Sequence, residues 1–217
     1  WKSLGLKYDI IISGYLGSID QIGMVKSIKD DFLKEGGLMI VDPVMGDNGK
    51  LYAHFDDKYV EAMKGLCRKA DILVPNLTEA CYLTGIGYEQ ANGGDYAAVL
   101  NALKALCPRP SVTGCDEVKS GKSVSTVYYT DDSGKTKTYS TEKIEGAFHG
   151  AGDVYSSALA GALARGVQTD KAVQLAADFT TASIRQTKAD GTEARYGLNS
   201  ESQMLAFLQA LDKAAKN

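Results

Sequence analysis

The hydrophobic positions of this chain form short apolar runs that alternate with longer segments of helical periodicity. Residues 8–13 form an apolar, β-rich run of the kind found in buried parallel strands. Apolar residues then recur at near-helical spacing from Ile22 to Phe32. This spacing predicts a helix that is capped by Asp20 and ends at Gly36-Gly37.

The same alternation continues along the rest of the chain. Further strands are predicted at residues 38–41, 72–74 and 111–113, and a hairpin at 124–129 and 136–144 around the turn 131–134. Helices are predicted from residue 56 to about 67, and at 78–83, 95–106, 152–165, 170–187 and 200–213. Strands that alternate with helices predict an α/β fold with a mainly parallel sheet covered on both faces, whose ligands bind at the carboxyl ends of the strands.

Composition narrows the class of protein. The chain has 217 residues, of which 44% are apolar and 24% charged, so we expect one globular domain over residues 1–217. The net charge of −3 without a basic block argues against nucleic acid as a partner. No apolar run approaches the roughly 18 residues of a membrane helix, and no signal peptide is evident, so we expect no membrane association and a cytoplasmic location.

Four cysteines and two histidines offer little metal chemistry. No CxxC pair occurs, and the cysteines fall in predicted helices and a loop. We therefore expect reduced, buried thiols and no zinc site. The cysteines are Cys67, Cys81, Cys107 and Cys115.

A glycine-bracketed turn at residues 148–153 runs directly into a helix. Free backbone amides at a helix amino terminus form an anion cradle that can hold a phosphoryl group. Asp153, in the first helical turn, is placed to accept the proton of an attacking hydroxyl. The alternative is that Gly150 and Gly152 only make a turn and Asp153 only complements the helix dipole, and spacing alone does not separate the two.

Two acidic motifs follow predicted strands. Asn76 and Glu79 have the arrangement to face Mg²⁺ beside nucleotide phosphates, although their spacing favours a capping box that only starts a helix. Asp42 and Asp47 bracket a tight loop, where they either hold hydrated Mg²⁺ or form a solvated turn. Tyr15 follows the first strand; by itself, packing in the core is favoured over covering a flat ligand ring.

Several other nucleotide-binding and catalytic motifs are incomplete or absent in this sequence. Gly121-Lys122-Ser123 has the end of a P-loop, but position 116 is Asp where that motif requires Gly. No GxGxxG follows a strand, and no GxSxG supplies a nucleophile. A lone histidine such as His149 is more often structural than catalytic, and the sequence shows no evident base for Cys115, so neither is given a catalytic role.

Four segments together resemble the vitamin B6 (pyridoxal/pyridoxamine) kinases of the ribokinase-like superfamily. Each is modest alone, but their order and spacing are specific, and the resemblance runs from about Tyr8 to the last helix. The segments are Ser13-Gly14-Tyr15-Leu16-Gly17-Ser18, Asp42-Pro43-Val44-Met45-Gly46-Asp47, Pro75-Asn76-Leu77-Thr78-Glu79 and Gly150-Ala151-Gly152-Asp153.

The resemblance implies a three-layer α/β/α sandwich that transfers the γ-phosphoryl group of MgATP to the 5′-hydroxyl of pyridoxal, pyridoxamine or pyridoxine. By matching position, Asp153 corresponds to the catalytic base and the amides of Gly150, Ala151 and Gly152 to the anion hole. Tyr15 corresponds to a residue near the pyridine ring. The resemblance also implies a homodimer, and K⁺ alongside Mg²⁺.

The same resemblance assigns residues to the nucleotide and the metal. Asp42 and Glu79 are the implied metal residues. The implied nucleotide-binding residues are Asp42, Asp47, Tyr52, Asn76, Glu79, Thr113 and Gly114.

Two departures from the family pattern stand out. Ala151 occupies a position where many superfamily members have Thr, which removes a hydroxyl from the anion hole but keeps the amide. The family's first strand and following segments, which supply much of the B6 pocket, have no counterpart before Trp1, so we expect the domain to lack its amino-terminal part. Two rival functions remain: a hydroxymethylpyrimidine kinase of thiamine synthesis, and a nucleotide-binding fragment without activity.

Overall fold

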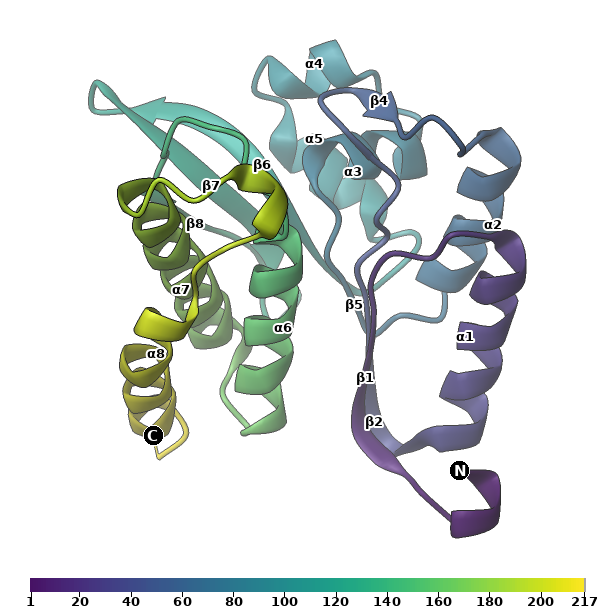
Figure 1. The fold of residues 1–217 in the computed structure, drawn as a ribbon. Helices are drawn as coiled ribbons and strands as arrows, with labels where there is room; N and C mark the ends of the chain where they lie inside the picture. The colour runs from purple at the N-terminus through teal and green to yellow at the C-terminus, as the bar shows by residue number, and fades with distance from the viewer. Residues whose placement is uncertain (217) are drawn as a thin grey trace. The chain divides into compact units, whose positions relative to one another are not determined.

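The computed structural model describes residues 1–216, apart from the side chain of Ala194. The chain forms two compact units, shown within the ribbon of Figure 1. Unit 1 comprises residues 1–115 and 128–136, and unit 2 comprises residues 116–127 and 137–217. Strands β6 (Arg109–Lys119), β7 (Lys122–Thr130) and β8 (Thr136–Glu142) contribute residues to both units. The expectation of a single domain over residues 1–217 stays a prediction.

Unit 1 contains the parallel part of the sheet. The strand order is β1-β2-β5-β6-β7-β8, and β1 (Tyr8–Ser13), β2 (Leu33–Val41), β5 (Ile72–Leu73) and β6 pair in parallel. Parallel neighbours need crossover connections, which the intervening helices supply. A mixed α/β structure with a mostly parallel central sheet flanked by helices confirms the predicted fold class.

The first two helices of unit 1 bury apolar side chains against the sheet. Helix α1 (Ile19–Phe32) buries Ile22, and α2 (Asp57–Cys67) buries a stripe that includes Met63. Both helices lie beside β1 and β2 in Figure 1. The core between these elements also contains Met39 and Leu73. These two residues, Ile22 and Met63 are fully or almost fully buried. The remaining helices of unit 1 are α3 (Leu77–Thr84), α4 (Tyr88–Asn92) and α5 (Tyr96–Leu103).

The first helix differs from its prediction at both ends. Ser18, rather than Asp20, caps α1, because its hydroxyl accepts a hydrogen bond from the Gln21 amide at 3.3 Å. The helix ends at Phe32, and Gly36-Gly37 lies inside β2. The pairing of β1 with β2 shifts register there, and a Cβ on Gly37 would lie 2.8 Å from the Asp9 carbonyl oxygen. The glycines therefore serve a bulge and not a helix end.

Three other elements were incompletely predicted. Strand β6 continues six residues beyond Thr113, past Gly114 in a left-handed conformation (φ 71°). Helix α4 and the small hairpin of β3 (Gly46–Asp47) and β4 (Lys50–Leu51) were missed. The four cysteines are buried, reduced thiols, as predicted.

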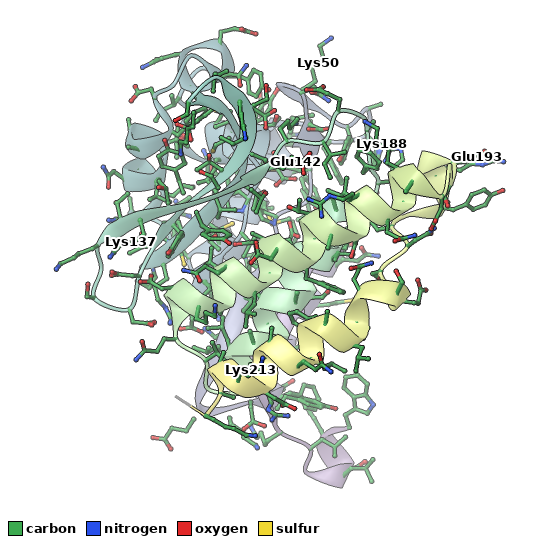
Figure 2. The ribbon with its side chains drawn as sticks, turned by 90° about the vertical axis from the view of Figure 1, so that its left-hand side faces the viewer. Lys50, Lys137, Glu142, Lys188, Glu193 and Lys213 are labelled. Carbon is green, nitrogen blue, oxygen red and sulfur yellow. The ribbon has the colours of Figure 1, made fainter. Side chains whose placement is uncertain are left out.

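Unit 2 contains parts of β6 and β7, most of the last strand, and the last helices. Strand β8 (Thr136–Glu142) is followed by α6 (Ala151–Ala164), α7 (Thr169–Ala189), a short 3-10 helix, η2 (Ala194–Tyr196), and α8 (Glu201–Ala214). Figure 2 shows α8 lying along α7, where the Phe179 and Phe207 rings are 4.7 Å apart. Within residues 1–216, no helix has the length and apolar character needed to cross a membrane.

Candidate active site

The loops after β1, β2 and β5 emerge at the same edge of the sheet. Ser13 pairs with Val41, and the Asp42 amide donates to the Ser13 carbonyl oxygen at 2.9 Å. The Val74 amide continues this pattern by donating to the Val41 carbonyl oxygen at 2.9 Å. Because these are carboxyl ends of parallel strands, the loops that carry the predicted residues of unit 1 are neighbours.

Asn76 and Glu79 form a complete capping box at the start of α3. The Asn76 side-chain oxygen accepts from the Glu79 amide at 2.9 Å, and Glu79 Oε2 accepts from the Asn76 amide at 2.8 Å. Glu79 Oε1 also accepts from the Met45 amide at 3.1 Å. The capping box that the sequence spacing favoured is therefore present. The Glu79 carboxyl group also ties the Asp42–Asp47 loop to α3 through the Met45 amide.

Burial dominates the electrostatics of Glu79, which is 2% exposed. Desolvation first, and the nearby Asp42 carboxylate second, raise the pKa of Glu79 well above its usual range. The amides of Asn76, Met45 and Gly46 act in the opposite direction on this pKa. Asp42 and Glu79 are thus two buried carboxyl groups close enough to affect each other electrostatically. A bound cation would reduce the repulsion between their negative charges.

Asp42 and Asp47 have different surroundings although they share one loop. Asp42 is buried and Asp47 is exposed. Asp47 accepts hydrogen bonds from the backbone and side-chain nitrogens of Asn48, at 2.8 and 3.0 Å. Asn76 Nδ2 donates to the Gly46 carbonyl oxygen at 2.9 Å, which fixes the base of the hairpin. Among residues 1–216, no cluster of three or more His, Cys, Asp or Glu side chains is placed to hold a metal ion.

Thr113 and Gly114 lie beside this edge, but within a strand rather than after one. The Thr113 amide donates to the Pro75 carbonyl oxygen at 2.9 Å, and Thr113 forms a parallel bridge with Asn76. The sequence placed a strand end here because β-rich residues stop at Gly114. The left-handed glycine instead lets β6 bend and continue.

Aromatic side chains surround the loop after β1. Tyr15 is 54% exposed, so the structure does not bury it in the core as its pattern alone favoured. Its ring lies 5.9 Å from Phe55, which stacks on Tyr59 at 3.8 Å. Tyr52, 39% exposed, lies 6.5 Å from the same Phe55 ring. The result is an open aromatic surface over a buried aromatic pair.

His54 is the residue of this surface that the sequence did not indicate. Its Nε2 atom lies 2.7 Å from the Tyr15 hydroxyl oxygen. The two residues are 39 positions apart, and no local spacing relates them. Only the fold brings them together.

The glycine turn and Asp153 lie in unit 2, at the amino terminus of α6. Gly150 is the N-cap residue in a left-handed conformation (φ 81°), and no side chain caps the helix. Ala151, Gly152 and Asp153 form the first turn, whose amides have no carbonyl partner four residues earlier. Gly152 and Asp153 are exposed. The amides and the carboxylate are thus open to an anion and to a hydroxyl, respectively.

Cations of α7 hold the segment that leads into this turn. Arg185 forms an ion pair with Glu142 at 2.8 Å, and Lys188 Nζ donates to the Glu145 carbonyl oxygen at 3.1 Å. Figure 2 labels Glu142 and Lys188, which lie on β8 and α7. Both contacts are exposed, so each contributes little stability by itself.

Comparison with known proteins gives a consistent family. The family model described as phosphomethylpyrimidine kinase matches residues 5–197. A pyridoxine kinase of Bacillus subtilis is 31% identical over 189 residues, which cover 84% of this chain and 66% of that protein. The chain spans about two thirds of the length of the first curated relatives that it matches, 66% and 67% of theirs.

Solved structures similar to this chain come from the same group of kinases. The pyridoxal kinase of Lactobacillus plantarum is 29% identical with a TM-score of 0.84, over 96% of this chain and 74% of that one. A Bacteroides thetaiotaomicron protein, described as a candidate phosphomethylpyrimidine kinase and crystallised with pyridoxal, is 31% identical with a TM-score of 0.80, over 98% and 73% of the two chains.

Proposed function

The chain belongs to the phosphomethylpyrimidine kinase family, and we propose that it transfers the γ-phosphoryl group of ATP to the 5′-hydroxyl of pyridoxal, pyridoxamine or pyridoxine in vitamin B6 salvage. The chain is similar to the pyridoxine kinase of Bacillus subtilis and to the pyridoxal kinase of Lactobacillus plantarum, which supports B6 vitamers as the substrate class. The observation that carries the proposal is the start of α6, where a glycine N-cap, uncapped amides and an exposed Asp153 occur together.

The α6 amino terminus supplies the chemistry of phosphoryl transfer. The substrate hydroxyl oxygen forms a bond to the γ-phosphorus while the bond to the bridging oxygen of ADP breaks. Asp153 accepts the hydroxyl proton. The amides of Gly150, Ala151 and Gly152 stabilise the charge on the moving phosphoryl group, and positioning contributes more than basicity.

Mg²⁺ fits the acidic edge of unit 1, with unequal roles for its two carboxyl groups. Oxygen donors are the ligands that Mg²⁺ takes, commonly with several waters and substrate phosphates completing its shell. Asp42 is a buried carboxyl group whose field raises the pKa of Glu79, which fits a nearby cation. Both Glu79 oxygens already accept backbone amides, so only their remaining lone pairs would be left for a metal ion or its water. Bound Mg²⁺ would neutralise phosphate charge, and K⁺ is proposed as the accompanying cation.

The remaining predicted residues keep their proposed roles. Tyr15 contacts the pyridine ring, in keeping with its exposure. The proposed assembly is a homodimer. The proposed nucleotide contacts are Asp42, Asp47, Tyr52, Asn76, Glu79, Thr113 and Gly114.

One rival activity has its own support. The family model carries the name of a phosphomethylpyrimidine kinase, and so does a similar Bacteroides structure, although that crystal contained pyridoxal. Phosphorylation of the hydroxymethyl group of an aminopyrimidine is therefore the second candidate function.

The role of Asp153 is tested by Asp153→Asn, with Asp20→Asn as the matched control. Asp20 also lies in the first turn of an exposed helix start, so it shares the dipole but not the glycine turn. We expect Asp153→Asn to lower kcat about a hundredfold or more. The dissociation constant for ATP should change by less than about tenfold, or 1.4 kcal/mol. Equal, small effects of the two variants would leave Asp153 only a dipole partner.

A further inference from the structure

His54 and Tyr15 form a polar pair on the exposed aromatic surface of unit 1. The Nε2 to hydroxyl distance is 2.7 Å, and the rings meet edge to face with centroids 6.2 Å apart. Both side chains are exposed. A ligand that reaches Tyr15 therefore meets a hydroxyl group that already has one hydrogen-bond partner.

Both rings of this pair rest on a fixed base. The His54 and Tyr15 rings lie 4.3 and 5.9 Å from the buried ring of Phe55. Phe55 stacks on Tyr59, whose hydroxyl donates to the Leu16 carbonyl oxygen at 2.5 Å. Burial raises the pKa of Tyr59 to about 12, so this donor keeps its proton. The Tyr15 loop is thus tied to α2.

The chemistry of the two groups gives the hydrogen bond its direction. A phenol is a stronger donor than a neutral imidazole N–H, and an imidazole nitrogen is a stronger acceptor than a phenol oxygen. When Nε2 is the unprotonated nitrogen of the His54 ring, the Tyr15 hydroxyl therefore donates to it. Its oxygen then offers only lone pairs to a ligand, whereas a free hydroxyl rotates to donate or to accept.

We propose that His54 is a positioning residue that fixes the Tyr15 hydroxyl as an acceptor and thereby favours substrates with a donor group beside the pyridine hydroxymethyl arm. This inference rests on the proposed function. Pyridoxamine carries an ammonium group there, which donates, while the aldehyde of pyridoxal only accepts. His54 thus selects for the amine and against the aldehyde.

Removing the imidazole acceptor tests this selection. We expect His54→Phe, which keeps a ring over Phe55, to lower the pyridoxamine to pyridoxal ratio of kcat/KM about tenfold, mainly through KM. His54→Gln retains an acceptor oxygen and should restore most of the ratio. The Tyr15→Phe variant should change the ratio similarly, and the double variant should equal Tyr15→Phe, because His54 then has no hydroxyl to orient. Tyr8→Phe, at another exposed tyrosine, is the control.

Dissociation constants of both vitamers, measured by calorimetry without ATP, separate this inference from the proposed function. Binding with the expected ratios but without phosphoryl transfer would refute the kinase proposal and support the role of His54. Turnover with an unchanged ratio in His54→Phe, or additive effects in the double variant, would overturn the role of His54. Binding of neither vitamer by the wild-type chain would overturn both.

Discussion

Glu79 offers the sharpest test of how the candidate site is built. Its two oxygens accept the amides of Met45 and Asn76, and the residue is 2% exposed. Glu79→Ala leaves both amides without this acceptor, at about 1–3 kcal/mol each. Relief from burying a carboxyl group near Asp42 offsets part of that cost. We therefore expect a loss of about 3 kcal/mol in the free energy of unfolding.

Urea unfolding followed by far-UV circular dichroism measures this loss. With a slope of about 2 kcal/mol per molar urea, the midpoint should fall by about 1.5 M. Glu79→Gln keeps one acceptor oxygen and should cost about half as much. Glu89→Ala, at an exposed position in the first turn of α4, is the control and should change the free energy by less than about 0.5 kcal/mol. A loss below about 1 kcal/mol for Glu79→Ala would refute the bridging role.

Three further predictions follow from particular contacts. Gly150→Ala should destabilise the protein by about 1 kcal/mol and raise KM for ATP, because φ is 81° at this position. Gly161→Ala, in the open middle of α6, should instead stabilise the protein by about 0.5–1 kcal/mol. Thermal unfolding measures both changes, and stability changes of the same sign in the two variants would contradict this reasoning. Glu79→Gln should raise the Mg²⁺ concentration needed for half-maximal activity, and an unchanged titration would leave Glu79 a purely structural cap. Burial raises the pKa of Cys81 and of Cys107 to about 11. Near pH 8, these thiols should therefore react with iodoacetamide roughly a hundredfold more slowly in the native chain than after denaturation. Equal reaction rates in the two states would contradict their burial.

The sequence predicted those elements whose local pattern agrees with their tertiary role. Helix α2 begins where the sequence predicted, and Asp56 caps it by accepting from the Tyr59 amide at 2.9 Å. The capping spacing of Asn76 and Glu79 is also present in full. In each case, a short-range hydrogen bond determines the structure, and short-range spacing is what a sequence displays.

The errors arose where a distant strand decides the local conformation. Gly36-Gly37 has the composition of a helix end, but Gly37 approaches the Asp9 carbonyl of the paired strand. Gly114 likewise suggested a strand end, although β6 continues through it. The contact of Gly37 with Asp9 is not visible in the local sequence.

The candidate site shows the same limit. The motifs located Asp42, Glu79 and Asp153 because each follows a strand or begins a helix. They did not show that Glu79 also holds the Met45 amide, nor that His54 meets Tyr15. Those contacts join segments 34 and 39 residues apart, and only the folded chain reveals them.

The central claim is tested most directly by measuring ATP-dependent phosphorylation of pyridoxal, pyridoxamine and hydroxymethyl aminopyrimidine by this protein in the presence of Mg²⁺. We predict phosphorylated B6 vitamers as the products, with a kcat that Asp153→Asn lowers about a hundredfold or more. Turnover of the aminopyrimidine alone, or ATP binding without transfer to any of the three acceptors, would contradict the account.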